Sequence, residues 1–82
     1  MTRINQNVEV NAFYFSTGRS FKSFPARVTL GDTQYTFKSG LQMLVRRGED
    51  VVRLFNMTDG LTNYRLRHEN DTWTLIGFEP AL

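Results

Sequence analysis

The strongest constraint on the fold is a set of turn dipeptides that divide the chain into short runs of β-forming residues. Gly31-Asp32, Asp59-Gly60 and Asn70-Asp71 each stand between two such runs. Glycine first in a two-residue loop suits a type II′ turn, Asp-Gly suits a type I′ turn, and both turns match the twist of paired strands. The spacing of these dipeptides therefore predicts β-hairpins in a mainly β fold.

The runs between and around these turns predict six strands. They are rich in β-branched and aromatic residues, which are enriched in strands. Pro25 lies at the entry to the second strand, where its missing N–H is tolerated. The predicted strands cover residues 8–15, 26–30, 33–38, 51–57, 61–68 and 72–78.

A helical pattern separates the third predicted strand from the fourth. Ser39 and Gln42 form a capping-box pair, and Gly48 stands where a left-handed C-cap residue belongs. The apolar residues at helical spacing are Leu41, Leu44 and Val45. We therefore predict one short helix near residues 39–47 and the element order β-β-β-α-β-β-β.

This order indicates an all-β or α+β domain. It fits a small antiparallel meander, or a barrel of the size of SH3-like and OB-like folds. The chain has 82 residues, of which 40% are hydrophobic, so we expect one compact domain over residues 1–82 with a core of modest size. Residues 1–6 precede the first predicted strand and are expected to be a flexible N-terminus.

The turn positions also predict which residues share a face of the sheet. The expected cross-strand pairs are Val28 with Tyr35, Phe55 with Tyr64, Leu66 with Leu75, and His68 with Trp73. The last three pairs, with Val51 and Met57, form the predicted core. The reverse face carries Val52, Leu54, Ile76 and Phe78 among polar residues that include Arg65 and Arg67. Either the helix covers this mixed face, or the face is an exposed platform for a partner.

Catalytic and metal-binding signatures are missing from the chain. It has no cysteine and one histidine, His68, and no nucleophile motif or phosphate-binding loop occurs. We therefore predict a protein that is not an enzyme and binds no cofactor, metal or small-molecule substrate. No apolar run is long enough to span a membrane, so we expect no membrane partner and a cytoplasmic location.

Arginine and aromatic residues carry the functional prediction. The chain has ten Lys and Arg against eight Asp and Glu, a net charge of +2, and eight of the ten bases are arginine. Arginine binds phosphate through two nitrogens and stacks on bases, so single-stranded nucleic acid is the first candidate partner. The residues expected to bind nucleic acid or another partner are Arg65, Arg67, Arg46, Arg47, Arg19, Phe21, Lys22 and Phe24.

A protein-interaction or homodimerisation module is the alternative. In this hypothesis the strand over residues 8–15 is an exposed sheet edge that pairs with another chain. The two hypotheses differ in their response to salt, because only binding to phosphates weakens steeply as salt rises.

Overall fold

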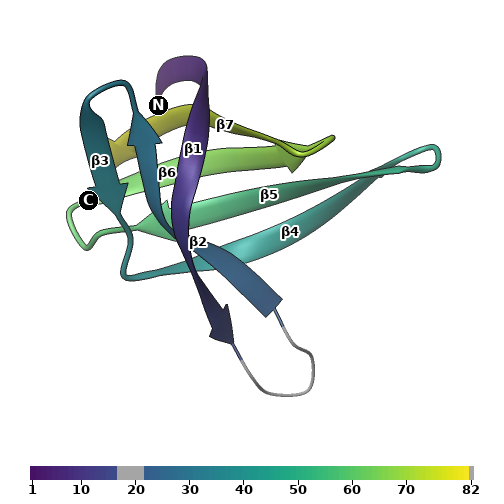
Figure 1. The fold of residues 1–82 in the computed structure, drawn as a ribbon, viewed down its shortest axis with the longest axis horizontal. Coiled ribbons are helices and arrows are strands. Elements are labelled where there is room, and N and C mark those ends of the chain that lie inside the picture. Colours follow the sequence, from purple (N-terminus) through teal and green to yellow (C-terminus); the bar gives the residue numbers. More distant parts are fainter. Residues whose placement is uncertain (17–21, 82) are drawn as a thin grey trace.

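The computed structural model describes residues 1–16 and 22–81 as one antiparallel sheet of seven strands (Figure 1). The strand order across the sheet is β3-β2-β1-β7-β6-β5-β4. The strands are β1 (Thr2–Ser16), β2 (Lys22–Leu30), β3 (Thr33–Thr36), β4 (Ser39–Arg47), β5 (Asp50–Thr58), β6 (Thr62–Glu69) and β7 (Thr72–Pro80). The prediction of a mainly β fold is confirmed, and of the two classes considered, all-β and α+β, the structure is all-β.

The predicted helix over residues 39–47 is wrong, and no helix occurs in the described part of the chain. These residues form β4, which pairs with β5 along its whole length, from Ser39 opposite Thr58 to Arg47 opposite Asp50. Gly48 has a φ of +61°, which suits the first position of a type II′ turn as well as a helix C-cap. The glycine therefore closes a hairpin, and the β4–β5 pairing decides between the two conformations.

The turns at Gly31-Asp32 and Asn70-Asp71 lie where the sequence placed them. Gly31 has a φ of +60°, as a type II′ turn requires, and Asn70 and Asp71 have φ values of 51° and 60°, as a type I′ turn requires. The predicted pairs Val28 with Tyr35, Leu66 with Leu75 and His68 with Trp73 are confirmed.

The turn between β5 and β6 lies one residue later than predicted. Asp59 and Thr62 flank it, and the Asp59 N–H donates to the Thr62 carbonyl at 3.2 Å. The Asp59 Oδ1 accepts from the N–H groups of Leu61 and Thr62 at 2.9 and 2.8 Å, and these two bonds lower the pKa of Asp59. Phe55 consequently pairs with Leu66 instead of Tyr64. The shift is of two residues, so the inward-facing set is unchanged.

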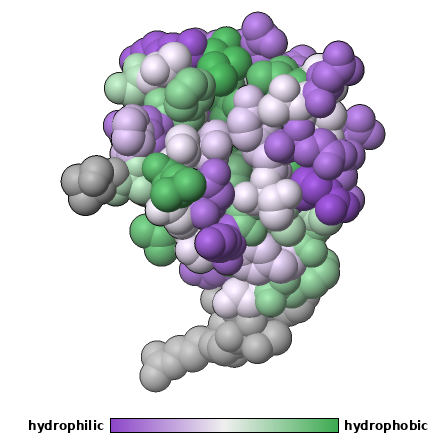
Figure 2. Space-filling model, turned by 90° about the vertical axis from the view of Figure 1, so that its left-hand side faces the viewer, coloured by the Kyte–Doolittle hydropathy of each residue, from purple (hydrophilic) through white to green (hydrophobic). Residues whose placement is uncertain are grey.

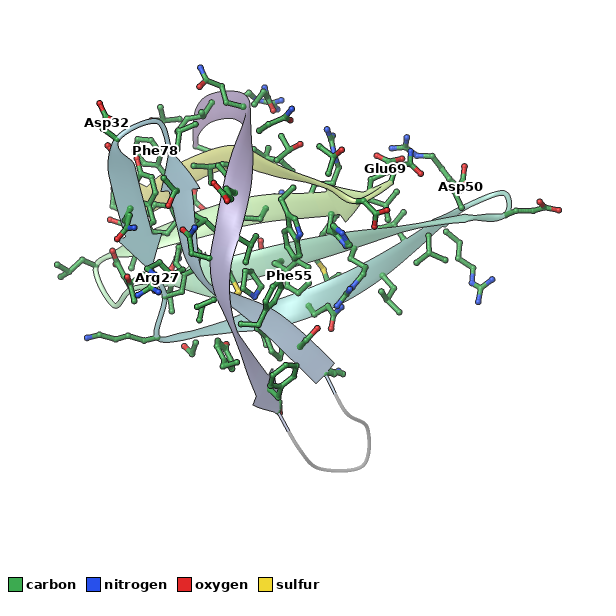
Figure 3. The ribbon with its side chains drawn as sticks, in the orientation of Figure 1. Arg27, Asp32, Asp50, Phe55, Glu69 and Phe78 are labelled. Atoms are coloured by element: carbon green, nitrogen blue, oxygen red, sulfur yellow. The ribbon has the colours of Figure 1, made fainter. Side chains whose placement is uncertain are left out.

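The core lies on the concave side of the curled sheet. Its buried members are Phe24, Val28, Phe37, Phe55, Met57, Tyr64, Leu66 and Leu75. Phe55 lies near its centre, where β1 and β2 cross over β5 and β4 (Figure 3). Trp73, half-buried, packs against this cluster.

Two predictions about the core are wrong for identifiable reasons: the face on which Phe78 lies and the burial of Val51. The register of β7 shifts between Arg65 and Leu66 of its partner strand, so Phe78 lies opposite Tyr64 and packs against the core instead of the mixed face. Val51 was expected in the core but is 44% exposed, because it lies near the tip of the β4–β5 hairpin. This hairpin projects beyond the other strands (Figure 1).

The first strand is central instead of an edge. β1 begins at Thr2, earlier than predicted, and pairs with β2 on one side and β7 on the other. The edges are β3 and β4, which do not pair with each other among the described residues. The sheet is therefore open, and the barrel, one of the two architectures predicted, does not form. The chain passes from one edge to the other through Phe37 and Lys38, whose N–H groups donate to the carbonyls of Ala26 and Thr58 at 2.8 Å each.

Candidate functional site: the outer face and the edge strand

The outer face of the sheet, opposite the core, presents ordered rows of side chains across five strands. The register between strands gives each row directly. One row runs from β4 to β1 through Leu41, Asn56, Arg65, Gly77 and Arg3, and the next through Met43, Leu54, Arg67, Thr74 and Asn7. Apolar groups therefore stand on β4, and arginines stand in the middle of the face.

The β4 end of these rows is exposed and apolar. Leu41 is 71% exposed, Met43 42% and Val45 39%, and all three share the outer face; we call them the β4 stripe. Leu44, on the other side of the strand, is 65% exposed. On the side of the molecule that holds β3 and the β5–β6 turn, by contrast, small groups of hydrophobic residues are separated by hydrophilic ones (Figure 2).

Among the described residues, no strand pairs with the other side of the β4 backbone. A two-residue loop closes on a hydrogen-bonded pair, here Arg47 and Asp50, and such pairs alternate along an antiparallel ladder. Leu41, Met43 and Val45 therefore direct their N–H and C=O groups to β5. The groups directed to the open edge belong to Gly40, Gln42, Leu44 and Arg46.

Arg65 lies where the sequence placed it, on the outer face of β6. Its Nε donates to Asn56 Oδ1 at 3.0 Å, and the side chain is half-buried. It lines a hollow of about 320 Å³ together with Leu41, Asn63 and Glu79, among others. Glu79 therefore brings a carboxylate to the same hollow as Arg65.

Arg67 lies two residues further along the same face. Its Nε is 3.7 Å from Glu69 Oε2, and its side chain is 41% exposed. Arg67 and Glu69 line a second hollow of about 250 Å³ with Asn7, Asn70, Thr72 and Thr74. The two arginines thus share one face, and each lines a hollow that a carboxylate also lines.

The other predicted binding residues do not join this pair as a group. Arg46 and Arg47 are exposed at the end of β4, where strand alternation puts them on opposite faces, so only Arg47 shares the outer face. Lys22 is exposed at the start of β2. Phe24 is 7% exposed and its ring stacks on Tyr14 with centroids 5.1 Å apart, so it belongs to the core. Arg19 and Phe21 lie outside the described residues.

Arg53, which was not among the predicted binding residues, connects side chains of three strands on the inner face near the β4 edge. The Arg53 guanidinium lies over the Phe55 ring at 5.3 Å, and its Nη2 donates to Ser23 Oγ at 3.3 Å. When the Gln42 amide is oriented with its oxygen toward Arg53, that oxygen accepts from Nε and Nη2 at 2.8 and 3.0 Å. Arg53 thereby ties β4 to β2 and β5.

His68 stacks on Trp73 with ring centroids 4.3 Å apart and 19° between the planes. Burial, with a smaller effect of the Arg53 charge, lowers the pKa of His68. Its ring therefore favours the neutral form and packs as part of the aromatic cluster. Within residues 1–16 and 22–81, no three His, Cys, Asp or Glu side chains are grouped to hold a metal ion. No helix in that part of the chain is long and apolar enough to cross a membrane.

The β4 stripe is the feature that sequence reasoning missed. Leu41, Met43 and Val45 alternate with period two, which indicates a strand, but Leu41, Leu44 and Val45 also fit a helix. The signal that separates the two is Gly48-Glu49, which repeats the glycine-first form of Gly31-Asp32. No protein-family model, curated protein or solved structure matches this chain.

Proposed function

We propose that this chain is a non-enzymatic binding domain that takes up an extended strand of a partner protein along the free edge of β4. The observation that carries the proposal is the nine-residue length of this edge strand together with its exposed apolar side chains. A free strand edge offers a row of unpaired N–H and C=O groups, and the side chains beside it provide specificity.

The contrast between the two edges supports a role for β4. Proteins protect sheet edges by keeping them short, charged or covered. β3 follows this rule, because it has four residues, Thr33 to Thr36, of which three are polar and exposed. β4 is more than twice as long, and its first charged residue is Arg46.

The test is an NMR titration of the ¹⁵N-labelled protein with a panel of nine-residue peptides. The peptides alternate apolar and acidic residues, and one set begins with an apolar residue while the other begins with an acidic one. Their carboxylates complement the charges of Arg46 and Arg47. We expect saturable 1:1 binding with the largest amide shifts at Gln42 and Leu44, whose N–H groups face the edge. Matched peptides with proline at alternate positions are the control, because proline lacks the N–H that pairing requires.

A Leu44→Pro variant makes the test specific to the edge. It removes one N–H from the open side of β4 and none from the β4–β5 ladder, so peptide binding is lost while the fold is kept. Peptide-induced amide shifts that spread over β1 and β2, or that are unchanged in the Leu44→Pro variant, would contradict the proposal.

A second candidate function rests on a separate observation, the shared outer face of Arg65 and Arg67 beside two hollows. It is the binding of single-stranded nucleic acid. Reversing both charges, Arg65→Glu with Arg67→Glu, should abolish retention of an oligonucleotide at low salt, whereas the exposed Arg27→Glu should not. If the unmodified protein retains no oligonucleotide at low salt, this candidate fails.

A further inference from the structure

We propose that the strand which β4 takes up is β4 of a second copy of this chain, antiparallel, with Met43 of the two copies face to face on a two-fold axis. This inference rests on the proposed function, because it names the partner for the same edge. It commits to one register, which the backbone alternation, the charges and the apolar side chains of β4 select together.

The backbone alternation limits the possible registers. In a regular antiparallel ladder, residues whose polar groups face the edge must lie opposite residues of the same kind. Gly40, Gln42, Leu44 and Arg46 therefore lie opposite members of the same set. With the axis at Met43, Gln42 pairs with Leu44 and Gly40 pairs with Arg46 of the other copy, and every edge-facing group of these four residues has a partner.

The same register joins the two β4 stripes. Leu41 of each copy lies opposite Val45 of the other, and Met43 lies opposite Met43, all on the outer face. These are the non-hydrogen-bonded positions, where facing side chains come closest. Six large apolar side chains that are exposed in the single chain then cover one another, which the hydrophobic effect favours.

The charges and the apolar side chains of β4 together favour this axis over the two neighbouring axes that the alternation allows, at Gln42 and at Leu44. Arg46 lies opposite Gly40 and Arg47 opposite Ser39, so no cation faces another cation, and the glycine leaves room for the arginine side chain. The Gly48-Glu49 turn of one copy comes beside Lys38 of the other, which adds an attraction between opposite charges at each end. An axis at Gln42 would put Arg46 opposite Lys38, a destabilising arrangement of like charges. An axis at Leu44 would put Leu41 opposite Arg47, so that this apolar side chain would lose its apolar partner.

The pattern is also self-complementary, as a two-fold interface requires. Its centre is apolar, and its basic end meets an end made of Ser39 and Gly40. A second copy therefore satisfies the whole edge with one sequence. It would extend the antiparallel sheet across the axis without a break.

Disulfide trapping tests the register directly, because the chain has no cysteine of its own. Facing residues at a non-hydrogen-bonded position have Cα atoms about 4.5 Å apart, which lies within the disulfide range of roughly 4.4–6.8 Å. Under mild oxidation, Met43→Cys should form a covalent dimer on the order of tenfold or more faster than Gln34→Cys, an exposed control on the β3 edge, because pairing raises the effective concentration of the thiols.

Two further variants distinguish this register from other contacts. Leu41→Cys should not link to itself, because its two copies lie about 13 Å apart along the strands. A mixture of Leu41→Cys and Val45→Cys should give the heterodimer, since these residues face each other. Far-UV circular dichroism of each variant confirms that it retains the sheet.

The results separate this inference from the proposed function. If Met43→Cys links no faster than Gln34→Cys, a second copy is not the partner, while peptide shifts at Gln42 and Leu44 would still support strand uptake. If Leu41→Cys links to itself as fast as Met43→Cys, the register is overturned. If neither linkage nor peptide binding occurs, both proposals fail.

Discussion

Phe55 is a fully buried residue that contacts side chains of two other strands in the core. Its ring lies 6.0 Å from Phe24 and 5.2 Å from Trp73 between centroids, and the Arg53 guanidinium covers it. Aromatic pairs at such distances add to the stabilisation that comes from burial alone. Phe55 therefore joins β2, β5 and β7 in one cluster.

Truncating the core should be costly at single positions. We expect Phe55→Ala and Leu66→Ala each to lower the free energy of unfolding by about 2 to 5 kcal/mol, because both side chains are fully buried. Urea unfolding measures the change. Leu61→Ala is the matched control, since Leu61 is 83% exposed and its loss should cost less than about 0.5 kcal/mol. Equal costs at buried and exposed positions would mean that the wrong face is inside.

His68 makes stability depend on pH. Its pKa in the folded protein lies below the ordinary value of 6.5, because burial and the charge of Arg53 disfavour the imidazolium, although Asp71 opposes this effect. Below about pH 6.5, His68 is therefore protonated to a greater extent in the unfolded chain than in the folded protein. The free energy of unfolding should fall as the pH decreases from 6.5 to the folded pKa and level off below it.

The measurement is an NMR titration of the His68 ring, together with urea unfolding between pH 5 and 8, a range chosen to span ordinary histidine titration. The His68→Gln variant cannot titrate in this range, so its stability should change less with pH. A ring that titrates above 6.5 would contradict the stacked, half-buried environment.

At the scale of the elements, β4 depends on its pairing with β5. Gly40 lies so close to that strand that a Cβ there would come within 2.8 Å of the Asn56 carbonyl oxygen. Its lack of a side chain permits the close approach at the start of the hairpin. The other end is closed by Gly48, so two glycines bound the segment that faces the open edge.

Proline substitution should separate the two sides of this strand. Met43→Pro removes an N–H that β5 uses, and Leu44→Pro removes one that faces the open edge. We expect Met43→Pro to lower the free energy of unfolding further, by on the order of 1 kcal/mol or more. Urea unfolding of the two variants compares them side by side. Equal losses, or a larger loss for Leu44→Pro, would contradict the β4–β5 register.

Individual hairpins could be predicted from the sequence where the turn type and the alternation agree. Gly31-Asp32 and Asn70-Asp71 are such cases, and their cross-strand pairs are correct. The turn between β5 and β6 lies one residue later than predicted because the Asp59 side chain accepts hydrogen bonds from the N–H groups of Leu61 and Thr62. Rules based on the turn dipeptide alone do not include such bonds. The side chains of β5 and β6 still lie on the predicted faces, because a shift of two residues does not change the face. The register shift in β7, by contrast, places Phe78 on the inner face.

Of the candidate site, the face of the two arginines could be predicted from the sequence, but the exposed edge formed by β4 could not. Arg65 and Arg67 were placed correctly because they lie on a regularly alternating strand. The segment 39–47 fits both a helix and a strand, and only its long-range pairing with β5 decides between them. A helix would have carried these apolar residues to the sheet surface, and the strand instead leaves them at its edge.

At the scale of the whole molecule, an open sheet leaves two edges with different properties. The chain passes directly from β3 to β4 through Phe37 and Lys38, yet only the second of these strands is long and apolar. The curled sheet encloses its core without closing, and the β4–β5 hairpin extends away from it (Figure 1). A domain with this shape is suited to extending its sheet through β4.

Native-state amide hydrogen exchange along β4 tests the account most directly. In dilute protein, the N–H groups of Met43 and Val45 should be protected by β5, and those of Gln42 and Leu44 should exchange rapidly from the open edge. Addition of a bound strand, or a rise in protein concentration if the second copy is the partner, should protect Gln42 and Leu44 as well. Equal protection of all four amides in dilute protein, or rapid exchange that no partner slows, would contradict an edge that takes up a strand.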